Sequence, residues 1–524
     1  MSIDTLRVRG RSKIALFQAE TPVEGLAAFS EREFIVEQCT RAQLEEPGYL
    51  AGLSAVIFEQ RIDNPRQIVR DLKSFAKRLL DYDCRVILLP APNRISLITR
   101  GLNDLRLQTA GLPLPEAEHI SAWQPIGRGD PPLPHLHVFD VGFAWVDIAN
   151  FIAEHPAGHA PSVTLNVNID GETESSLGAS SRLLIRRAFW DCTEVHLVPM
   201  LGGRSGVSVY RAYAELAKGH LERWPLPFFV KLGDRDKIFT EYQNYENKVD
   251  PYIPFHLGPH LVQDRCVLGA HEGLIVGDYV DESESLIRCA RDGRAVSAIA
   301  CLFDRTLHSW YRSARIEARS LTDILSHRFP REISTGRFAR ARELGAKKDL
   351  AQLRELFERC TSTPVLVGPV HGDLHAANVR VRATDAILID FYAHRDDLLL
   401  YDAASLEASL LVDAFADGDR DELDVWLKSI APLYDEVPLH APLNANPKNP
   451  SLWFHLCVRQ IRLYARRMEC VPNQYGVALA AALLAKASKD PSAPNPQASR
   501  RAAAYVMAER VLSNTYELLV KRSS

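Results

Sequence analysis

The segment 370–378, Val-His-Gly-Asp-Leu-His-Ala-Ala-Asn, places one carboxylate and one carboxamide on a single loop, at Asp373 and Asn378. A second carboxylate, Asp390, follows the apolar run 387–389, which is typical of a strand. Phosphoryl transfer needs such oxygen atoms, because a base must orient the acceptor hydroxyl and metal ions must neutralise charge on a triphosphate. This chemistry assigns Asp373 as the base and Asn378 and Asp390 as ligands of Mg²⁺.

The motif His-Gly-Asp at 371–373, Asn378 beyond it, and Ile-Asp-Phe at 389–391 together resemble the aminoglycoside phosphotransferase and choline kinase-like superfamily. The resemblance covers residues 180–520 in rough bounds, and within the superfamily it is similar to the bacterial "ternary complex associated" kinase-like domains. It implies an α+β, protein kinase-like fold with an antiparallel sheet in the N-lobe, a helical C-lobe, and ATP and Mg²⁺ as cofactors. The alternative is a loop of turn and cap residues that matches by chance.

A single lysine, Lys231, lies inside the apolar run 228–232. An ammonium group buried there without a partner would be costly. The resemblance implies that Lys231 binds the phosphates of ATP and pairs with a glutamate of the following helix, which we expect over 237–249. Glu241 and Glu246 are both candidates, and Glu241 is favoured because it lies beside the apolar stripe of that helix. The alternative is a solvated surface helix.

The glycine-rich segment 201–206, Leu-Gly-Gly-Arg-Ser-Gly, stands between two short apolar runs that are typical of strands. Glycines such as Gly203 and Gly206 let backbone N–H groups approach a phosphate, and Ser205 could add a hydroxyl donor. We expect these three residues to bind ATP, although the same pattern also fits an ordinary hairpin.

Two more residues are expected to support the catalytic loop without touching the substrate. The ring of His371 is expected to fix the loop, with a proton shuttle as the alternative. Asp402 fits the N-cap of a helix, and the resemblance implies that it braces the loop. Four arginines further on have helical spacing, and a solvated helix face is favoured over a surface for an anionic acceptor or a partner: Arg459, Arg462, Arg466 and Arg467.

Composition shifts divide the chain into four expected parts. These are an α/β domain over 1–155, a linker rich in Gly, Ser, Ala and Pro over 156–180, a kinase-like N-lobe over 181–282 and a helical C-lobe over 283–524.

The first part shows apolar runs at 55–58 and 85–89, with an amphipathic helical pattern over 65–82 between them. Strand, helix and strand predict a parallel crossover and a small doubly wound domain. It weakly resembles a response-regulator receiver, but the third strand ends in Glu59 rather than the acceptor Asp, and the acidic pair expected after the first strand is missing. We therefore expect a degenerate receiver-like domain used for protein contacts, with a plain solvent-facing Glu59 as the alternative.

Composition excludes some classes of function. The 524 residues carry a formal charge of −4, so nucleic acid is not an expected partner of the whole chain. Nine cysteines without Cys-x-x-Cys spacing suit reduced thiols better than disulfides or zinc. The N-terminus has no apolar signal core, and the longest apolar run, 477–485, is far shorter than the ~20 residues that span a bilayer. We expect a cytoplasmic protein.

Three functions compete at this point. The leading one is a phosphotransferase that uses ATP and Mg²⁺ and acts on a hydroxyl of a small molecule or protein, because all five ionic and amide residues are present. A nucleotide-binding regulatory or scaffold protein is the second, motivated by the degenerate N-terminal domain. A nucleotidyltransferase that moves AMP to a protein is the third.

Overall fold

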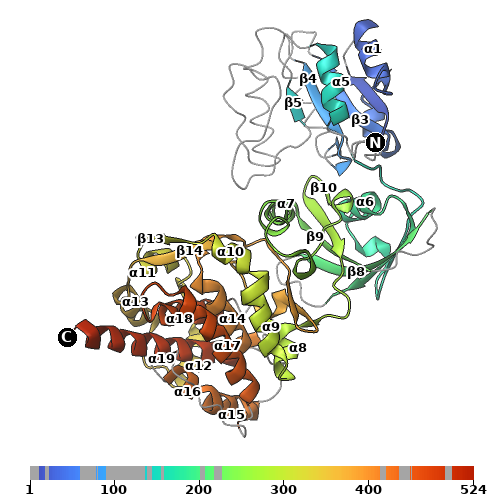
Figure 1. Cartoon of the computed structure of the whole chain (residues 1–524). Coiled ribbons are helices and arrows are strands. Elements are labelled where there is room, and N and C mark those ends of the chain that lie inside the picture. The colour runs from blue at the N-terminus through green and yellow to red at the C-terminus, as the bar shows by residue number, and fades with distance from the viewer. Residues whose placement is uncertain are drawn as a thin grey trace. The chain divides into compact units, whose positions relative to one another are not determined.

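The computed structural model describes residues 11–17, 23–59, 78–79, 81–89, 136–138, 144–154, 158–200, 207–217, 227–413, 420–435, 439, 449, 451–489 and 498–523 (Figure 1). The chain divides into two compact units. The first comprises Met1–Gln243 and His260–Asp281, and the second comprises Asn244–Pro259 and Glu282–Ser524. The predicted α+β kinase-like class is confirmed, with a sheet-rich lobe in the first unit and a helical lobe in the second.

The N-terminal domain is a parallel sheet in the order β2-β1-β3-β4-β5, which is the doubly wound order of receiver domains. Alternate residues of the strands face opposite sides, and both sides carry an apolar core, as parallel sheets require. The elements are β1 (Lys13–Phe17), α1 (Val23–Ser30), β2 (Ile35–Gln38), α2 (Pro47–Ala51), β3 (Leu53–Glu59), β4 (Arg85–Leu89), β5 (Leu136–Val138) and α5 (Trp145–Glu154). Glu59 ends β3 as expected, but its side chain and most of the helix expected over 65–82 lie outside the described residues.

The N-lobe is a six-stranded sheet in the order β10-β11-β9-β8-β7-β6. Its elements are β6 (Asn166–Ile169), α6 (Ala179–Ala188), β7 (Cys192–Pro199), β8 (Ser208–Leu216), β9 (Phe228–Asp234), α7 (Arg235–Asn244), β10 (Val267–Leu268) and β11 (Glu272–Asp278). The sheet is antiparallel as expected except at one edge, within the segment 156–180 that was expected to be a linker. Strand β6 arises inside that segment and pairs parallel to β7, because α6 supplies the crossover that a parallel pair needs. Its burial alternates, so a short half-buried strand was hidden in a polar stretch.

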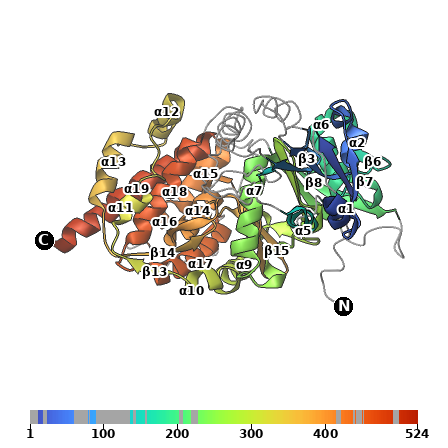
Figure 2. The same ribbon diagram turned by 90° about the horizontal axis from the view of Figure 1, so that it is seen from above.

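The second unit is mainly helical, with two small three-stranded sheets, β12-β15-β16 and β13-β14-β17. The strands are β12 (Glu284–Ser285), β13 (Arg315–Glu317), β14 (Val365–Val370), β15 (Val379–Arg382), β16 (Asp385–Leu388) and β17 (Arg395–Leu398). The helices are α8 (Leu286–Arg291), α9 (Ala295–Cys301), α10 (His308–Arg312), α11 (Leu321–Leu325), α12 (Thr335–Glu343), α13 (Leu350–Arg359), α14 (Leu400–Asp413), α15 (Arg420–Ile430), α16 (Pro432–Asp435), α17 (Leu452–Met468), α18 (Gln474–Ser488) and α19 (Ala498–Ser523). Helices α14, α17, α18 and α19 pack together and form the core of this lobe (Figures 1 and 2).

One expectation about α17 is wrong. Arg462 is not on a solvated face: it is 3% exposed and forms a two-pronged ion pair with the fully buried Glu407 of α14, at 2.7 and 3.1 Å. The hydroxyl of Tyr475 donates to the same carboxylate at 2.7 Å. A buried charge needs such a partner, so the pair ties α17, α14 and α18 together.

All nine cysteines are free thiols, and seven of them are buried. Within the described ranges, none of the helices combines the length and apolar character needed to cross a membrane.

Candidate active site

Lys231 and Glu241 meet in the first unit. Lys231 sits in the middle of β9, opposite Val209 of β8 and Ile275 of β11, and its Nζ lies 2.5 Å from Glu241 Oε2. The two side chains are 13% and 11% exposed, so the pair is largely shielded from water. Glu246, the other candidate, is exposed on the π-helical turn Tyr245–Val249. The pair forms because β9 runs straight into α7, and Asp234 Oδ1 caps that helix by accepting from Asp236 N and Lys237 N.

The glycine-rich segment was also expected to bind ATP. Gly203, Ser205 and Gly206 lie outside the described residues, between the end of β7 at Pro199 and the start of β8 at Ser208. Their expected role in binding ATP stays a prediction.

Asp373 lies in the second unit, on the loop that follows β14. The loop turns sharply at Gly372, whose φ is +80°, and a Cβ there would come within 2.2 Å of Ala393 O. Glycine is therefore required at this position. The turn leaves the Asp373 side chain 46% exposed, where a substrate hydroxyl could reach it.

The carboxylate of Asp402 stabilises the backbone of this loop. It is wholly buried, and its carboxylate accepts from His371 N at 2.7 Å and from Gly372 N at 3.1 Å. It lies inside the first turn of α14 rather than at an N-cap, so that reading of the sequence is wrong. Burial raises the pKa of Asp402, while the charge of His371 and the two N–H donors act to lower it.

His371 behaves as a structural residue in this geometry. It is fully buried, and its Nε2 lies 3.0 Å from Ile389 O. The contact joins the catalytic loop to the segment that leads into Asp390. Its ring is buried, which fits the expected structural role.

Asn378 and Asp390 are the expected metal ligands. Asn378 donates through Nδ2 to Asp373 O at 3.2 Å, which directs its amide nitrogen inward and makes its oxygen the atom that could meet a cation. Its backbone O accepts from Ile389 N at 3.0 Å, which places it beside the chain segment of Asp390. Asp390 is exposed and adopts a φ of +69°, a strained conformation for a residue with a side chain.

Asn378 and Asp390 offer oxygen atoms as donors to a cation. In the described part of the chain no group of three or more His, Cys, Asp and Glu side chains could hold a metal ion. One carboxylate and one carboxamide are hard oxygen ligands, and Mg²⁺ is commonly held by one or two such groups, completed by water and substrate phosphates.

Comparison with known proteins bears on the second unit. Residues 284–438 match the profile of the phosphotransferase enzyme family. The matched segment lies within residues 180–520, over which the sequence resembles the superfamily. No curated protein matches the chain.

Solved structures are similar to the chain at low identity. One is a choline/ethanolamine kinase family protein from Mesorhizobium loti, with 12% identity, 61% of this chain and 92% of that chain covered, and a TM-score of 0.34. Another is an aminoglycoside phosphotransferase from Streptomyces rimosus, with 16% identity, 54% and 99% covered, and a TM-score of 0.30. An amicoumacin kinase solved with AMP-PNP and Ca²⁺ shares 11% identity, with 61% and 88% covered and a TM-score of 0.32.

Two lysines and two histidines act on the carboxylate of Asp373. Lys489 Nζ lies 3.9 Å from Asp373 Oδ1, and His375 Nε2 lies 3.9 Å from Oδ2. Lys486, 5% exposed, pairs with Asp413 at 2.9 Å. Burial acts to raise the pKa of Asp373, but Lys489, His375, Lys486 and His371 outweigh it and lower that pKa. Burial and Lys486 lower the pKa of His375 to about 4, so His375 is neutral near pH 7.

Arg328 is a further support that sequence reasoning missed. Its guanidinium donates to Gly372 O at 3.1 Å and to Asp397 Oδ2 at 3.0 Å, and it stacks 4.0 Å above the ring of Tyr401. It therefore joins the catalytic loop to β17 and α14. It lies 44 residues before Gly372 in the sequence, outside the motif that marks the loop.

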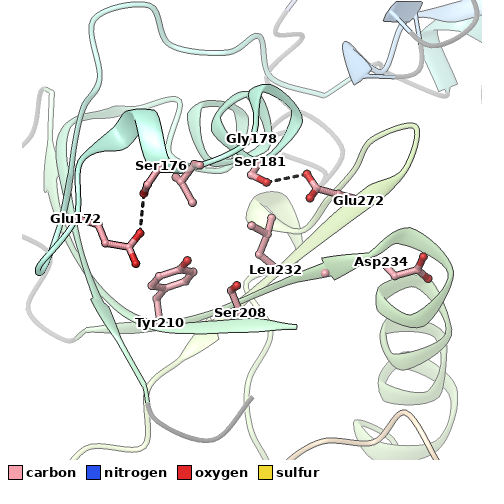
Figure 3. Close-up of a pocket in the computed structure, with 11 residues that line it drawn as sticks. Glu172, Ser176, Gly178, Ser181, Ser208, Tyr210, Leu232, Asp234 and Glu272 are labelled. Atoms are coloured by element: carbon pink, nitrogen blue, oxygen red, sulfur yellow. Dashed lines mark hydrogen bonds between the residues drawn. The ribbon is translucent and has the colours of Figure 1, made fainter. Parts of the chain in front are cut away.

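The first unit also holds a cavity of about 320 Å³ that is not the expected nucleotide site (Figure 3). Leu232 of β9 lines it, and successive strand residues face opposite sides, so Lys231 points away from it. Its carboxylates have local structural partners: Glu172 accepts from Ser176, Glu272 accepts from Ser181, and Asp234 caps α7 (Figure 3). We assign no ligand to this cavity.

Proposed function

We propose that the protein is a phosphotransferase that uses ATP and Mg²⁺ and transfers the γ-phosphoryl group to a hydroxyl. The observation that carries the proposal is the Asp373 loop, which presents a half-exposed, ionised carboxylate on a backbone fixed by the buried Asp402. The match of residues 284–438 to the phosphotransferase enzyme family supports the same chemistry.

Each residue then has a distinct task. Lys231, held by Glu241, binds phosphate oxygens of ATP. Asp373 accepts the proton of the acceptor hydroxyl and aims its oxygen at phosphorus; its lowered pKa keeps it ionised near neutral pH. Asn378 and Asp390 would hold Mg²⁺, which when bound neutralises charge on the triphosphate.

Calorimetric titration with ATP, with and without Mg²⁺, tests the proposal. Wild-type protein should bind ATP with Mg²⁺ present, and Asp390→Ala should lose the metal-dependent part of the binding. Asp385→Ala is the matched control, because Asp385 begins β16, the strand that leads to Asp390, but forms an ion pair with Arg305 at the surface. Absence of any binding by the wild type would contradict the proposal and favour a scaffold role.

Transfer itself is tested by radiolabelled phosphate from γ-labelled ATP, with a panel of hydroxyl acceptors and the protein itself as targets. Label from the γ-position in the product supports phosphoryl transfer. Label that appears only when the α-phosphate carries it would instead identify a nucleotidyltransferase.

A further inference from the structure

The tip of the β10–β11 hairpin contacts the N-terminal domain. Ala270 N donates to Asp81 Oδ1 at 3.0 Å, and the Ala270 side chain belongs to the apolar cluster that contains Leu79 and Cys84. A Cβ on Gly269 would lie 3.1 Å from the same Asp81 oxygen. The tip of an N-lobe hairpin is thus part of the core of the other domain.

Arg187 of α6 strengthens the same contact. It is 1% exposed, and its Nη2 forms a 2.9 Å ion pair with Asp83 Oδ2. Its Nη1 donates to Asp81 O at 2.9 Å and to Leu268 O, at the end of β10, at 3.3 Å. One buried guanidinium therefore bonds both to the segment 81–83 and to the hairpin. Removing one partner of such a pair leaves a buried charge uncompensated, so the contact is costly to break.

The other side of the same tip contacts α7. Arg235, the first residue of α7, is 4% exposed. Its backbone N donates to His271 O at 3.0 Å, and its Nη1 donates to Gly269 O at 2.9 Å. Further along, a Cβ on Gly273 would come within 2.7 Å of Ile238 Cγ2, so β11 and α7 pack without space for a side chain. Ile238 is one turn before Glu241 on α7.

We propose that the N-terminal α/β domain positions α7 through the tip 269–271, and so holds Glu241 against Lys231. The proposal rests on the phosphotransferase function above, in which the ion pair between the strand lysine and the helix glutamate must be in place for turnover. Arg235 is the positioning residue, and Asp81, Asp83 and Arg187 are the contacts that fix the tip. The degenerate receiver-like domain would then act on the kinase-like site from within the same chain.

The geometry favours coupling over simple attachment because the two sets of bonds converge on three consecutive residues. The carboxylate of Asp81 accepts from the backbone N of Ala270. Arg235 donates to the backbone oxygens of the residues on either side of Ala270, which are Gly269 and His271. A shift of the tip away from Asp81 therefore moves the acceptors of Arg235. Such a shift would displace the first turn of α7.

The test uses the full chain with Asp83→Asn, which removes the charge that faces Arg187. The matched control is Arg186→Ala, on the same helix, whose side chain bonds within the N-lobe to Glu174, at 2.8 Å, and to nearby backbone oxygens. Hydrogen exchange of the α7 amides is the first readout. Asp83→Asn should speed exchange in α7 by about tenfold, the effect of losing one charge-assisted bond, and Arg186→Ala should leave α7 unchanged.

Turnover gives the second readout through a double-mutant cycle. Asp83→Asn should lower turnover about tenfold in the wild type but have little further effect in Glu241→Gln, because on this proposal Asp83 affects turnover only through the ion pair of Lys231 and Glu241. Arg186→Ala should have the same small effect in both backgrounds. Additive effects of Asp83→Asn and Glu241→Gln would overturn the proposal, as would unchanged exchange in α7.

Two outcomes must be kept apart. If the wild type neither binds nor turns over ATP, the phosphotransferase function fails, but hydrogen exchange of α7 still decides the positioning role without nucleotide. If Asp83→Asn does not fold, Gly269→Ala provides a smaller change, because its Cβ would press on Asp81 Oδ1 and Leu184 at 3.1 and 3.2 Å. Faster exchange in α7 of that variant supports the proposal, and unchanged exchange contradicts it.

Discussion

In the first unit, Lys231 and Glu241 meet because two regular elements, β9 and α7, follow each other directly and point the two side chains to one place. In the second unit, Asp373 and Asn378 lie on a loop with almost no regular structure, and their positions depend on buried groups elsewhere in the chain. Asp402 bonds two backbone amides of the loop, and Ser409 Oγ accepts from Ala376 N at 2.9 Å. Arg328 bonds to Gly372 O.

This difference indicates which substitutions should disturb the Lys231–Glu241 pair and which should disturb the Asp373 loop. A charge pair made by a strand and a helix is sensitive to how the helix is held at its end. A loop that presents a base is sensitive to residues that never meet the substrate, because an unsatisfied buried amide costs more than the bond itself contributes. The following changes probe that contrast, beginning with the base itself.

Replacement of Asp373 by Asn should give the largest effect. The carboxamide keeps the shape but cannot accept the proton of the acceptor, so turnover should fall by about 10²- to 10⁴-fold, the usual contribution of a general base. ATP affinity, measured by calorimetry with Mg²⁺, should change little. Turnover equal to that of the wild type would show that Asp373 is not the base.

Asp402→Ala should be the most damaging change outside the reacting groups. It leaves the amides of His371 and Gly372 without their buried acceptor, and local opening of the loop should become easier by about 2–4 kcal/mol. Native-state hydrogen exchange at those two amides measures this free energy. Ser409→Ala, which removes one bond to the same loop, is the graded control and should cost about 1 kcal/mol. Equal effects of the two variants would contradict the bracing role of Asp402.

The contrast between the halves also explains what the sequence could predict. Periodicity placed Lys231 in an apolar strand and Glu241 beside the apolar stripe of the next helix, and the family resemblance implied their pairing. The structure brings the two side chains together. Asp373, Asn378 and Asp390 were found by their motif, but the bonds that hold them come from Arg328, Asp402, Ser409 and Lys489, which lie far from the motif in sequence. Only Asp402 was anticipated, through a family resemblance, and its place inside α14 was not.

Two errors share one physical cause. Arg462 looked solvated because its neighbours on α17 are basic, and β6 looked like a linker because its residues are polar on one side. In each case the burial depends on a partner that local sequence cannot show: Glu407 of α14 for Arg462, and β7 with α6 for β6. Long-range pairing decides these positions, whereas the helical character of the lobe that contains α14, α17, α18 and α19 was expected.

Glu241→Gln tests the ion pair that β9 and α7 form in the first unit. Glutamine keeps the length but removes the charge that Lys231 meets at 2.5 Å, so turnover should fall about tenfold, the value of one charge-assisted hydrogen bond. The thermal midpoint should fall as well, since removing one charge from a largely shielded ion pair is destabilising. Glu246→Gln, on the exposed turn after α7, should leave turnover unchanged. If Glu246→Gln proved the more harmful, the pairing of Lys231 would have to be reassigned.

Lys489→Ala should have the smallest effect, on the pH dependence of kcat/KM. Lys489 is 49% exposed and helps to lower the pKa of Asp373, together with His375, Lys486 and His371, against the effect of burial. Without Lys489 that pKa rises, and since Asp373 must be ionised to act as base, the acid limb of the profile should move to higher pH. Solvent screening keeps the shift small, and added salt should reduce it further. Lys348→Ala is the matched control, because Lys348 Nζ also lies 3.9 Å from a carboxylate, that of Glu509, away from the loop. A shift to lower pH, or an equal shift in Lys348→Ala, would show that the charge of Lys489 does not act on Asp373.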